Sequence, residues 1–277
     1  NMSKISIVTA FYDIGRGDWS MDVEKNGGPL PHYLQRSTDK YIEHFKRLCE
    51  IDTEIIVYTS PDLAQQLAAV SPNVKVVEYD YFNIHQELRD RIEAIQTDPK
   101  FIKRINPYQV RNPEYWSKDY VGVTSLKASF VDDAFGRGLV TNEWASWVDF
   151  GYCRDDEHVP TSKKWDYDFT PGLMHYFNYR EPNHNRQMEN VQLAVLNNIV
   201  YIIGGVFVGQ KEQWSVLKND MHKSLEVLMA NGLVDDDQGL LLMSYFMNPD
   251  MYELHKMDPN APLEEVRSII CKFNKYE

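Results

Sequence analysis

Ile5-Ser-Ile-Val-Thr-Ala-Phe11 is a continuous run of apolar and β-prone residues, and it predicts a buried β-strand near the start of the chain. The segment that follows, Tyr12-Asp-Ile-Gly-Arg-Gly-Asp-Trp19, is polar and contains glycines. Glycine lets the backbone take conformations in which it can approach a ligand closely. We therefore expect a ligand-binding loop at the carboxyl end of the first strand.

The chain continues as an alternation of helices and strands. Apolar residues at helical spacing predict a helix over 33–49, a strand is expected at 54–58, and a second helix and a third strand at 61–70 and 74–78. The order strand, helix, strand, helix, strand builds a parallel sheet with right-handed crossovers. The chain up to about residue 151 is therefore predicted to be a Rossmann-type α/β structure.

The stretch 79–120 is polar and charged, with a helical pattern at 88–95 and prolines at positions 107 and 113, and it predicts a helical excursion or lid. A further helix, expected over 121–135, leads into the next strand and carries Lys127. This lysine could contact a ligand phosphate. An exposed helical lysine is more often only solvated, so both interpretations stay open.

The run Trp144-Ala-Ser-Trp-Val-Asp-Phe-Gly-Tyr152 predicts a buried strand that ends on a single carboxylate, Asp149. In an open α/β sheet ligands collect at the carboxyl ends of the strands, where this acid could hold the divalent ion of a nucleotide-sugar diphosphate. An aspartate that caps a turn or the next helix explains the same run. The run alone does not choose between these interpretations.

Gly204 and Gly205 separate two short strand-like runs within 200–209. Because glycine has no side chain, the pair could allow a ligand to approach the backbone. A bulge or a tight turn is the alternative explanation.

Three consecutive acids at positions 235–237 precede a strongly apolar helical run. Capping of a helix N-terminus is a sufficient explanation for one of them but not for three. A cleft that accepts a sugar hydroxyl needs a carboxylate to take its proton, and Asp236 or Asp237 is the candidate for this role.

Composition limits the partners. The 277 residues, 43% of them hydrophobic, can bury a large core as one domain, with or without an appended lobe. The net charge of −12 argues against a broad nucleic-acid surface, since phosphate backbones require clustered Lys and Arg. Binding of an anionic ligand would need a local source of positive charge, such as a metal ion or a few cationic side chains at the site.

Cysteine usage and hydropathy indicate the compartment. The three cysteines, Cys49, Cys153 and Cys271, have no CxxC spacing and leave an odd thiol, which favours the reducing cytoplasm. No apolar run has the length of a membrane span, and the first residues predict a strand and not a signal peptide. Small basic islands at 100–104 and 163–164 leave peripheral contact with the inner membrane open.

Four motifs together resemble the bacterial HtrL/YibB (WlaTC-like) family over nearly the whole chain. They are Val8-Thr-Ala-Phe-Tyr-Asp-Ile-Gly-Arg-Gly-Asp-Trp19, Trp147-Val-Asp-Phe-Gly-Tyr152, Gly204-Gly-Val-Phe207 and Asp236-Asp-Gln-Gly-Leu-Leu-Leu-Met243.

The resemblance implies a GT-A-type glycosyltransferase that moves a sugar from a nucleotide-sugar, most simply a UDP-sugar, to a glycan or lipid-linked acceptor of a bacterial surface polysaccharide. It also implies one mixed, mostly parallel sheet flanked by helices, with a nucleotide-binding half at 1–151 and an acceptor-binding half at 152–277.

Carried over onto this sequence, the resemblance assigns a set of site residues. It places Thr9, Ala10, Phe11 and Tyr12 at the base and ribose, Asp13 and Arg16 at the ribose or diphosphate, and Asp149 on the metal. The residues themselves add further candidates around the nucleotide-sugar: Lys127, Gly204, Gly205, Gln238 and Lys256.

The motif around Asp149 departs from the usual DxD pattern, because Gly151 stands where a second Asp is expected. Mn²⁺ or Mg²⁺ prefers several oxygen ligands, so a second protein ligand must come from elsewhere. The resemblance suggests the late histidine His255, with the neighbouring Lys256 on a phosphate.

Two mechanisms remain compatible with Asp236-Asp237-Gln238. In an inverting enzyme Asp236 or Asp237 deprotonates the acceptor, and we prefer this mechanism; in a retaining enzyme Gln238 lies under the sugar ring. A non-catalytic nucleotide-binding or assembly protein is the alternative function, because the missing second Asp would permit it. A dehydrogenase is disfavoured, since the first loop lacks the GxGxxG that cradles a dinucleotide.

Overall fold

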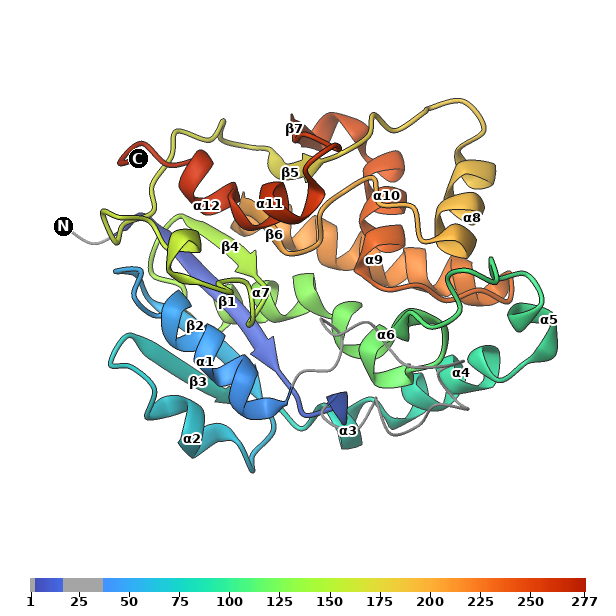
Figure 1. Cartoon of the computed structure of the whole chain (residues 1–277), viewed down its shortest axis with the longest axis horizontal. Helices are drawn as coiled ribbons and strands as arrows, with labels where there is room; N and C mark the ends of the chain where they lie inside the picture. Colours follow the sequence, from blue (N-terminus) through green and yellow to red (C-terminus); the bar gives the residue numbers. More distant parts are fainter. Residues whose placement is uncertain (1–2, 17–36) are drawn as a thin grey trace.

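A single twisted sheet organises the molecule (Figure 1). In the computed structural model, which describes residues 3–16 and 37–277, seven strands lie in the order β3-β2-β1-β4-β6-β5-β7. Their bounds are β1 Ile5–Phe11, β2 Ile55–Thr59, β3 Val74–Glu78, β4 Trp144–Val148, β5 Met174–Asn178, β6 Val206–Gln210 and β7 Tyr252–Lys256.

The first half of the sheet is parallel, as predicted. β1 pairs in parallel with β2, β2 with β3, and β4 joins the other side of β1, again in parallel. The helices α1 (Thr38–Leu48) and α2 (Ala64–Ala68) make the crossovers. The expected residues 33–36 of the first helix lie outside the described chain. The chain places β2 and β3 on one side of β1 and then β4 on its other side. The direction in which strands are added therefore reverses between β1 and β4.

The second half makes the sheet mixed. β6 runs antiparallel to both of its neighbours, β4 and β5, whereas β7 pairs with β5 in parallel. The prediction of a mixed, mostly parallel sheet is therefore confirmed. Because β4 and β6 are hydrogen-bonded neighbours, one sheet connects the regions on both sides of residue 151.

Side chains alternate between two apolar layers. Val8 and Trp147 pack on one face with α7 (Lys127–Gly136) and α9 (Lys211–Ala230), and the adjacent Ile7 and Val148 pack on the other face with α1 and α12 (Ile269–Lys272). This is the period of two that a strand imposes. Both faces are covered, which explains why β1 is buried along its full length.

The predicted helical excursion is present between β3 and β4. It consists of α3 (Tyr81–Ile84), α4 (Gln86–Gln96), α5 (Pro99–Ile102) and η3 (Pro113–Tyr115), followed by α6 (Lys118–Thr124) and α7. The prediction of a single helix over 121–135 is wrong, because the helix is interrupted between α6 and α7. There the hydroxyls of Thr124 and Ser125 donate to the carbonyls of Tyr120 and Gly122 at 2.8 and 2.7 Å, so side chains satisfy the end of α6.

The remaining helices cover the C-terminal half. They are α8 (Gln187–Asn197), α9, α10 (Asp237–Met247), α11 (Pro262–Arg267) and α12, with short 3₁₀ turns η4 (Asp156–His158) and η5 (Pro249–Met251). In Figure 1 the helices α8, α9 and α10 lie on the opposite side of the molecule from α1 and α2. Within the described residues, every helix is too short or too polar to cross a bilayer.

Candidate active site

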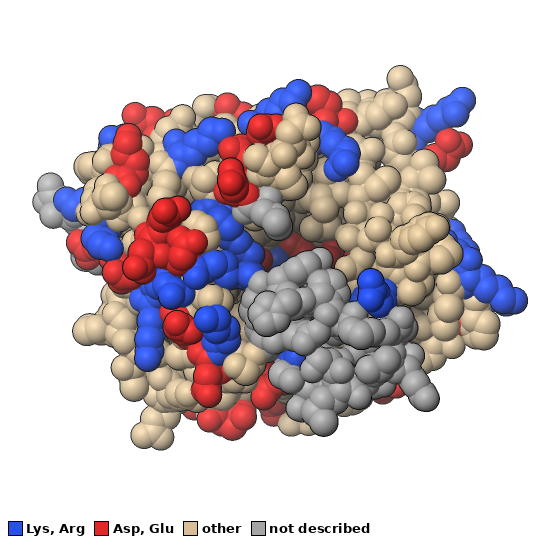
Figure 2. All heavy atoms as spheres, in the orientation of Figure 1, with Lys and Arg blue, Asp and Glu red and all other residues tan. Residues whose placement is uncertain are grey.

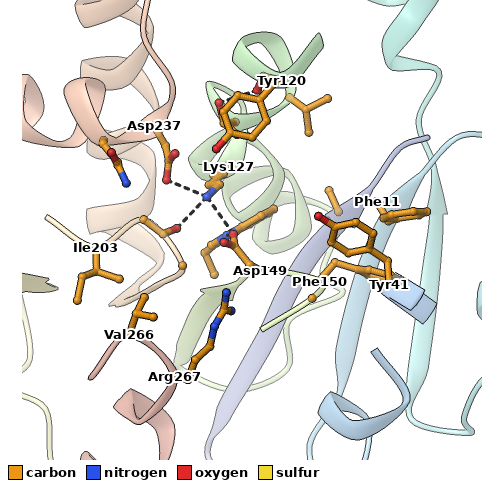
Figure 3. A pocket seen from close by; sticks show the side chains of 18 of the residues that line it. Phe11, Tyr41, Tyr120, Lys127, Asp149, Phe150, Ile203, Asp237, Val266 and Arg267 are labelled. Atoms are coloured by element: carbon orange, nitrogen blue, oxygen red, sulfur yellow. Dashed lines mark hydrogen bonds and ion pairs between the residues drawn. The ribbon is translucent and has the colours of Figure 1, made fainter. Parts of the chain in front are cut away.

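A cavity of about 410 Å³ opens at the carboxyl ends of β1 and β4 (Figure 3). Its walls include Phe11 and Tyr12, at and just after the end of β1, and Asp149 and Gly151, which follow β4. The boundary between β1 and β4 is the switch point of this sheet, and open α/β sheets bind ligands in the crevice outside such a point. The cavity is therefore where the fold itself predicts a ligand.

Lys127 occupies the centre of the cavity wall. Its Nζ donates to Asp237 Oδ2 at 2.8 Å and to the Gly204 carbonyl at 2.8 Å, and it lies 2.9 Å from Asp149 Oδ1 (Figure 3). Burial lowers the pKa of Lys127, but the two carboxylates outweigh it and the net pKa is raised. Lys127 is therefore a buried cation shared by two acids and not a solvated helical lysine.

Asp149 is held in position on both its backbone and its side chain. Its N–H donates to the Gly205 carbonyl at 2.9 Å, and the Trp147 indole N–H donates to Oδ1 at 2.8 Å. Burial raises the pKa of Asp149, whereas Lys127, Trp147 and Arg267 lower it, and the net pKa lies below the ordinary value. The side chain is still 41% exposed, so an ionised carboxylate faces the cavity.

The three acids before α10 have different positions. Asp236 is the N-cap and accepts from the Gln238 N–H at 3.1 Å, and Asp235 accepts from the Gly239 N–H at 2.9 Å. Asp237 begins the helix and lines the cavity. Burial raises the pKa of Asp237, and Lys127 offsets only part of this effect. Backbone contacts thus explain two of the acids, and the third faces the site.

Gly204 and Gly151 are glycines for steric reasons. A Cβ on Gly204 would lie 1.6 Å from Asp237 Oδ2, and one on Gly151 would lie 2.9 Å from the Tyr41 ring. A side chain at either position would require its neighbour to move. The absence of the second Asp of a DxD motif therefore follows from the packing of Tyr41 against the turn after β4.

Cations gather around the cavity although the chain is acidic. Lys127 is joined in its lining by Arg16, Arg154 and Arg267. Arg154 Nε donates to the Gly151 carbonyl at 2.8 Å, Arg267 Nη1 donates to the Tyr152 carbonyl at 3.1 Å, and the Arg16 guanidinium lies 5.2 Å from the centre of the Tyr120 ring. Figure 2 shows Lys and Arg side chains beside a hollow in one face. A lining of this charge suits an anionic ligand.

One wall of the cavity is aromatic. The rings of Phe11 and Phe150 stack with centroids 4.5 Å apart, and Tyr41 lies 5.7 Å from Phe11. Tyr12 is fixed on the opposite side by its O–H, which donates to the Tyr79 carbonyl at 2.9 Å. Flat rings next to cations provide surfaces for a planar base and for charged groups in the same cavity.

The structure brings most of the predicted site residues into this cavity. Those in its lining are Ala10, Phe11, Tyr12, Arg16, Lys127, Asp149, Gly204, Gly205, Asp237 and Gln238.

Four predicted residues lie elsewhere in the described chain. Thr9 is buried inside β1, Asp13 is exposed and accepts from the Gly15 N–H at 3.0 Å, and Asp236 is buried beside Asp237 without lining the cavity. Lys256 is exposed at the end of β7. The lining of the cavity does not include these four residues, and their contact with a nucleotide-sugar or an acceptor stays a prediction.

The structure does not bring His255, the second metal ligand suggested by the sequence, next to Asp149. His255 lies on β7, which is separated from β4 by β6 and β5, a lateral distance of roughly 14 Å at the usual strand spacing. Direct ligands of one ion lie only about 2 to 2.6 Å from it. His255 instead contacts His175, with their Nε2 and Nδ1 atoms 2.9 Å apart.

Oxygen ligands for a divalent cation are nevertheless present in the cavity. The exposed carboxylate of Asp149 and the carboxylate of Asp237 flank Lys127, and Asp149 Oδ2 faces Gly205, where a Cβ would lie 3.4 Å away. Mg²⁺ and Mn²⁺ prefer such ligands and accept substrate oxygens in the remaining positions. The residues fit an ion held by Asp149 and by substrate oxygens.

Sequence patterns missed several residues of the lining. Tyr41, Tyr120, Trp147, Arg154 and Arg267 all contribute to it. Arg154 could have been found, because it lies in the loop directly after the strand that delivers Asp149. Arg267 belongs to α11, near the other end of the chain, and nothing local indicates its role.

Comparisons with known proteins add a family. The family model described as "Bacterial protein of unknown function (HtrL_YibB)" matches residues 3–260. "Protein HtrL" of Escherichia coli (strain K12) is 38% identical over 255 residues, covering 91% of this chain and 88% of that protein. The crystal structure of mouse xyloside xylosyltransferase 1, apo form, is similar with a TM-score of 0.41 and 11% identity, covering 90% of this chain and 84% of that chain.

Proposed function

The chain belongs to the bacterial HtrL_YibB family, and we propose that it is a glycosyltransferase that transfers a sugar from a nucleotide-sugar, most simply a UDP-sugar, to a glycan or lipid-linked acceptor. The observation that carries this proposal is the cavity at the switch point of the sheet, where Lys127 joins Asp149 to Asp237 among further cations. Its parts correspond to the parts of a nucleotide-sugar.

The cations support a diphosphate as the central group of the ligand. A chain of net charge −12 repels anions in general, so Arg16, Lys127, Arg154 and Arg267 must attract one locally. β1 is followed by aromatic and acidic residues and not by a glycine cradle, so side chains would have to bind the phosphates. Arginine is suited to this because its planar guanidinium can bind a phosphate through two hydrogen bonds.

The aromatic wall supports a nucleotide base next to the diphosphate. The partly exposed Tyr41 presents its ring at the β1 side of the cavity, backed by Phe11 and Phe150, while Lys127 and Asp149 lie further toward β4 and β6 (Figure 3). A base against the Tyr41 ring would direct its phosphates toward the cations. The sugar would then reach Gly204 and Gln238.

We include Mn²⁺ or Mg²⁺ in the proposal, held by Asp149 and by oxygens of the diphosphate. When bound, the ion would supply positive charge to the nucleoside diphosphate that leaves. Lys127 adds charge of the same sign, and it holds both carboxylates in place.

The opposite pKa shifts of Asp149 and Asp237 support different roles for the two acids. Asp149 has a lowered pKa and stays ionised, whereas burial raises the pKa of Asp237 toward the range of a general base. Asp237 would take the proton of the acceptor hydroxyl while that oxygen attacks the anomeric carbon and the bond to the diphosphate breaks. This is transfer with inversion; in a retaining mechanism Gln238 would lie beside the sugar instead.

We place the reaction in bacterial surface-polysaccharide synthesis, at the cytoplasmic face of the inner membrane. The support is the family resemblance together with the three cysteines, none of which is paired within the described residues. Unpaired thiols are usual in a reducing compartment.

The test is calorimetric titration of UDP, GDP and CDP, with and without Mn²⁺, into the wild type and Asp149→Asn. The control is Asp52→Asn, an exposed acid just before the amino end of β2, at the opposite end of that strand from the cavity. We expect UDP to bind the wild type and the control equally, and to bind Asp149→Asn at least about tenfold more weakly, a loss of about 1.4 kcal/mol.

The outcomes separate the possible functions. Equal UDP affinity of the wild type, Asp149→Asn and Asp52→Asn would show that UDP does not bind in this cavity. If Asp149→Asn binds UDP more weakly but Mn²⁺ has no effect on the wild type, the cavity stays in the proposal and the metal ion is dropped. UDP-sugar binding without release of UDP in the presence of bacterial glycan acceptors would favour a non-catalytic nucleotide-binding protein. The steric exclusion of a second acid at Gly151 is the observation that favours this second candidate.

A further inference from the structure

His175, Glu253 and His255 form a cluster of metal-ligating side chains outside the cavity. His175 Nδ1 lies 2.9 Å from His255 Nε2 and 3.5 Å from Glu253 Oε2, and one ligand atom from each residue lies within 4.8 Å of the others. We propose that these three residues bind a Zn²⁺-class ion that joins β5 to β7, separately from the cavity.

The register of two strands creates the cluster. β5 and β7 pair in parallel, with His175 opposite Glu253 and Phe177 opposite His255. Side chains at positions i and i+2 of a strand lie on the same face. Glu253 and His255 therefore both lie on the face of β7 that adjoins His175, and all three ligands come from two hydrogen-bonded strands.

The orientation of His175 leaves the correct nitrogen for a metal. Its Nε2 lies 2.8 Å from the Thr170 carbonyl oxygen, which can only accept, so Nε2 carries the proton and donates. Nδ1 of the neutral ring is then a lone pair directed at His255 and Glu253. A ligating histidine whose other nitrogen donates to a backbone carbonyl is the usual arrangement around protein-bound metals.

Two of the three distances between the ligand atoms are close to those of a tetrahedral site. With metal to nitrogen bonds of about 2.0 to 2.1 Å, two ligands of a tetrahedral Zn²⁺ lie roughly 3.3 Å apart. The separations from His175 Nδ1, 2.9 and 3.5 Å, bracket this value. Shifts of a few tenths of an ångström, with the His255 proton moved from Nε2 to Nδ1, would convert the hydrogen-bonded histidine pair into two ligands.

The surroundings enclose the site on one side and open it on the other. The His175 side chain is fully buried. Phe169, Phe177 and Phe273 lie 5.1 to 5.9 Å from the His255 ring and keep the site apolar. The Glu253 side chain is 41% exposed, which leaves a path to solvent and a position for water.

The donor atoms distinguish this site from the cavity. Two imidazoles and one carboxylate suit Zn²⁺ and related transition metals, whereas the oxygen donors of Asp149 and Asp237 suit Mg²⁺ or Mn²⁺. β7 leads directly to α11, which contributes Arg267 to the cavity. An ion between β5 and β7 would therefore stabilise the strand from which the C-terminal wall of the cavity begins.

The test measures Zn²⁺ binding by the chelator-treated, tag-free full chain in the absence of nucleotide, by competition with a chromophoric chelator, and then records the visible spectrum with Co²⁺. The variants are Glu253→Gln, which keeps its shape and is partly exposed, and His255→Ala. The controls are His222→Ala, an exposed histidine on α9, and Asp149→Asn in the cavity.

We expect one Zn²⁺ per chain, a tetrahedral Co²⁺ spectrum, and a rise in Tm of roughly 5 °C with Zn²⁺ in excess. Glu253→Gln and His255→Ala should bind Zn²⁺ at least tenfold more weakly, and both controls should bind it as the wild type does. A wild type that binds no Zn²⁺, or whose affinity is unchanged in both variants, would overturn the site in favour of a structural histidine pair.

A loss of Zn²⁺ in Asp149→Asn would also overturn it, by placing the ion in the cavity. Because no nucleotide is present, failure of UDP binding would leave the result of this experiment unchanged.

Discussion

Lys127 holds a buried ammonium between the carboxylates of Asp149 and Asp237, which would otherwise repel each other across the cavity. Removing one member of a buried charge cluster typically costs about 3 to 5 kcal/mol, because the remaining charges lose their partner. Burial raises the pKa of both acids and the ammonium lowers both, so the net pKa of Asp149 falls while burial still outweighs Lys127 at Asp237. Burial and this one lysine together set the charge pattern of the site.

The tight contact at Gly204 gives a residue-level prediction. Gly204→Ala would place a Cβ 1.6 Å from Asp237 Oδ2 and push this carboxylate away from Lys127, whereas Gly205→Ala meets Asp149 Oδ2 only at 3.4 Å. We expect Gly204→Ala to lower the free energy of unfolding in urea by about 2 kcal/mol and to abolish UDP binding. Gly205→Ala should stay within about 0.5 kcal/mol of the wild type. Equal losses in both variants would contradict this account.

The N-terminal end of α10 concentrates buried acids behind the cavity. Glu114, Asp235 and Asp236 lie within 4.8 Å of one another through one carboxylate oxygen each, and the Tyr120 hydroxyl donates to Asp236 at 3.5 Å. Burial, followed by neighbouring carboxylates, raises the pKa of all three, for Asp236 to about 7. A helix N-terminus favours carboxylates, but so many in one apolar place hold their protons at mildly acidic pH.

The buried acids at the N-terminal end of α10 predict that the stability of the protein depends on pH. Because the folded-state pKa of Asp236 is raised from 3.8 to about 7, its contribution is complete below pH 4 and is lost as the pH rises through 7. Between pH 5 and 8 the free energy of unfolding should fall by about 3 kcal/mol through this group alone. Glu114, Asp235, Asp237 and Lys127 face the same region, so their titration adds to the profile without reversing its direction.

Asp236→Asn keeps a side chain that can cap the helix N-terminus and removes the titratable carboxyl group. Urea denaturation from pH 5 to 8 should therefore give a flatter profile for this variant than for the wild type. A wild type that becomes more stable toward pH 8, or a variant with the same slope, would show that Asp236 is ionised in the folded protein.

At the scale of the whole molecule, an acidic chain surrounds a cationic cavity. Its lining joins the end of β1, the helix α7, the turn after β4 and the C-terminal helix α11, so residues from 10 to 267 meet around one volume. Each cation there acts against the field of a protein with net charge −12. Anion binding is thus a property of the assembled fold and not of any segment.

Substitution of Arg267 tests whether α11, which is far from β1 in the sequence, contributes to the cavity's ligand binding. Arg267→Gln should weaken UDP binding about tenfold, a loss of about 1.4 kcal/mol, because one charge-assisted hydrogen bond to the diphosphate disappears. Arg104→Gln is the control, since that exposed arginine donates to the Asn231 carbonyl and does not line the cavity. Calorimetric titration with UDP checks both, and equal affinity of Arg267→Gln and the wild type would exclude α11 from the nucleotide site.

The sequence by itself determined the features that depend on local pattern. Apolar runs set β1, β2 and β3, helical spacing set most of α10, and an acid directly after an apolar strand marked Asp149 as a candidate. These signals are local because burial and hydrogen bonding within one element repeat with its period.

Only the tertiary structure decided which distant residues meet. It inserted β6 antiparallel between β4 and β5, brought Lys127 between two acids far from it in the chain, and paired His255 with His175 instead of Asp149. Strand order and register fix such contacts, and no short window of sequence contains both partners. The candidate chemistry was therefore visible in the chain, and its arrangement came from the fold.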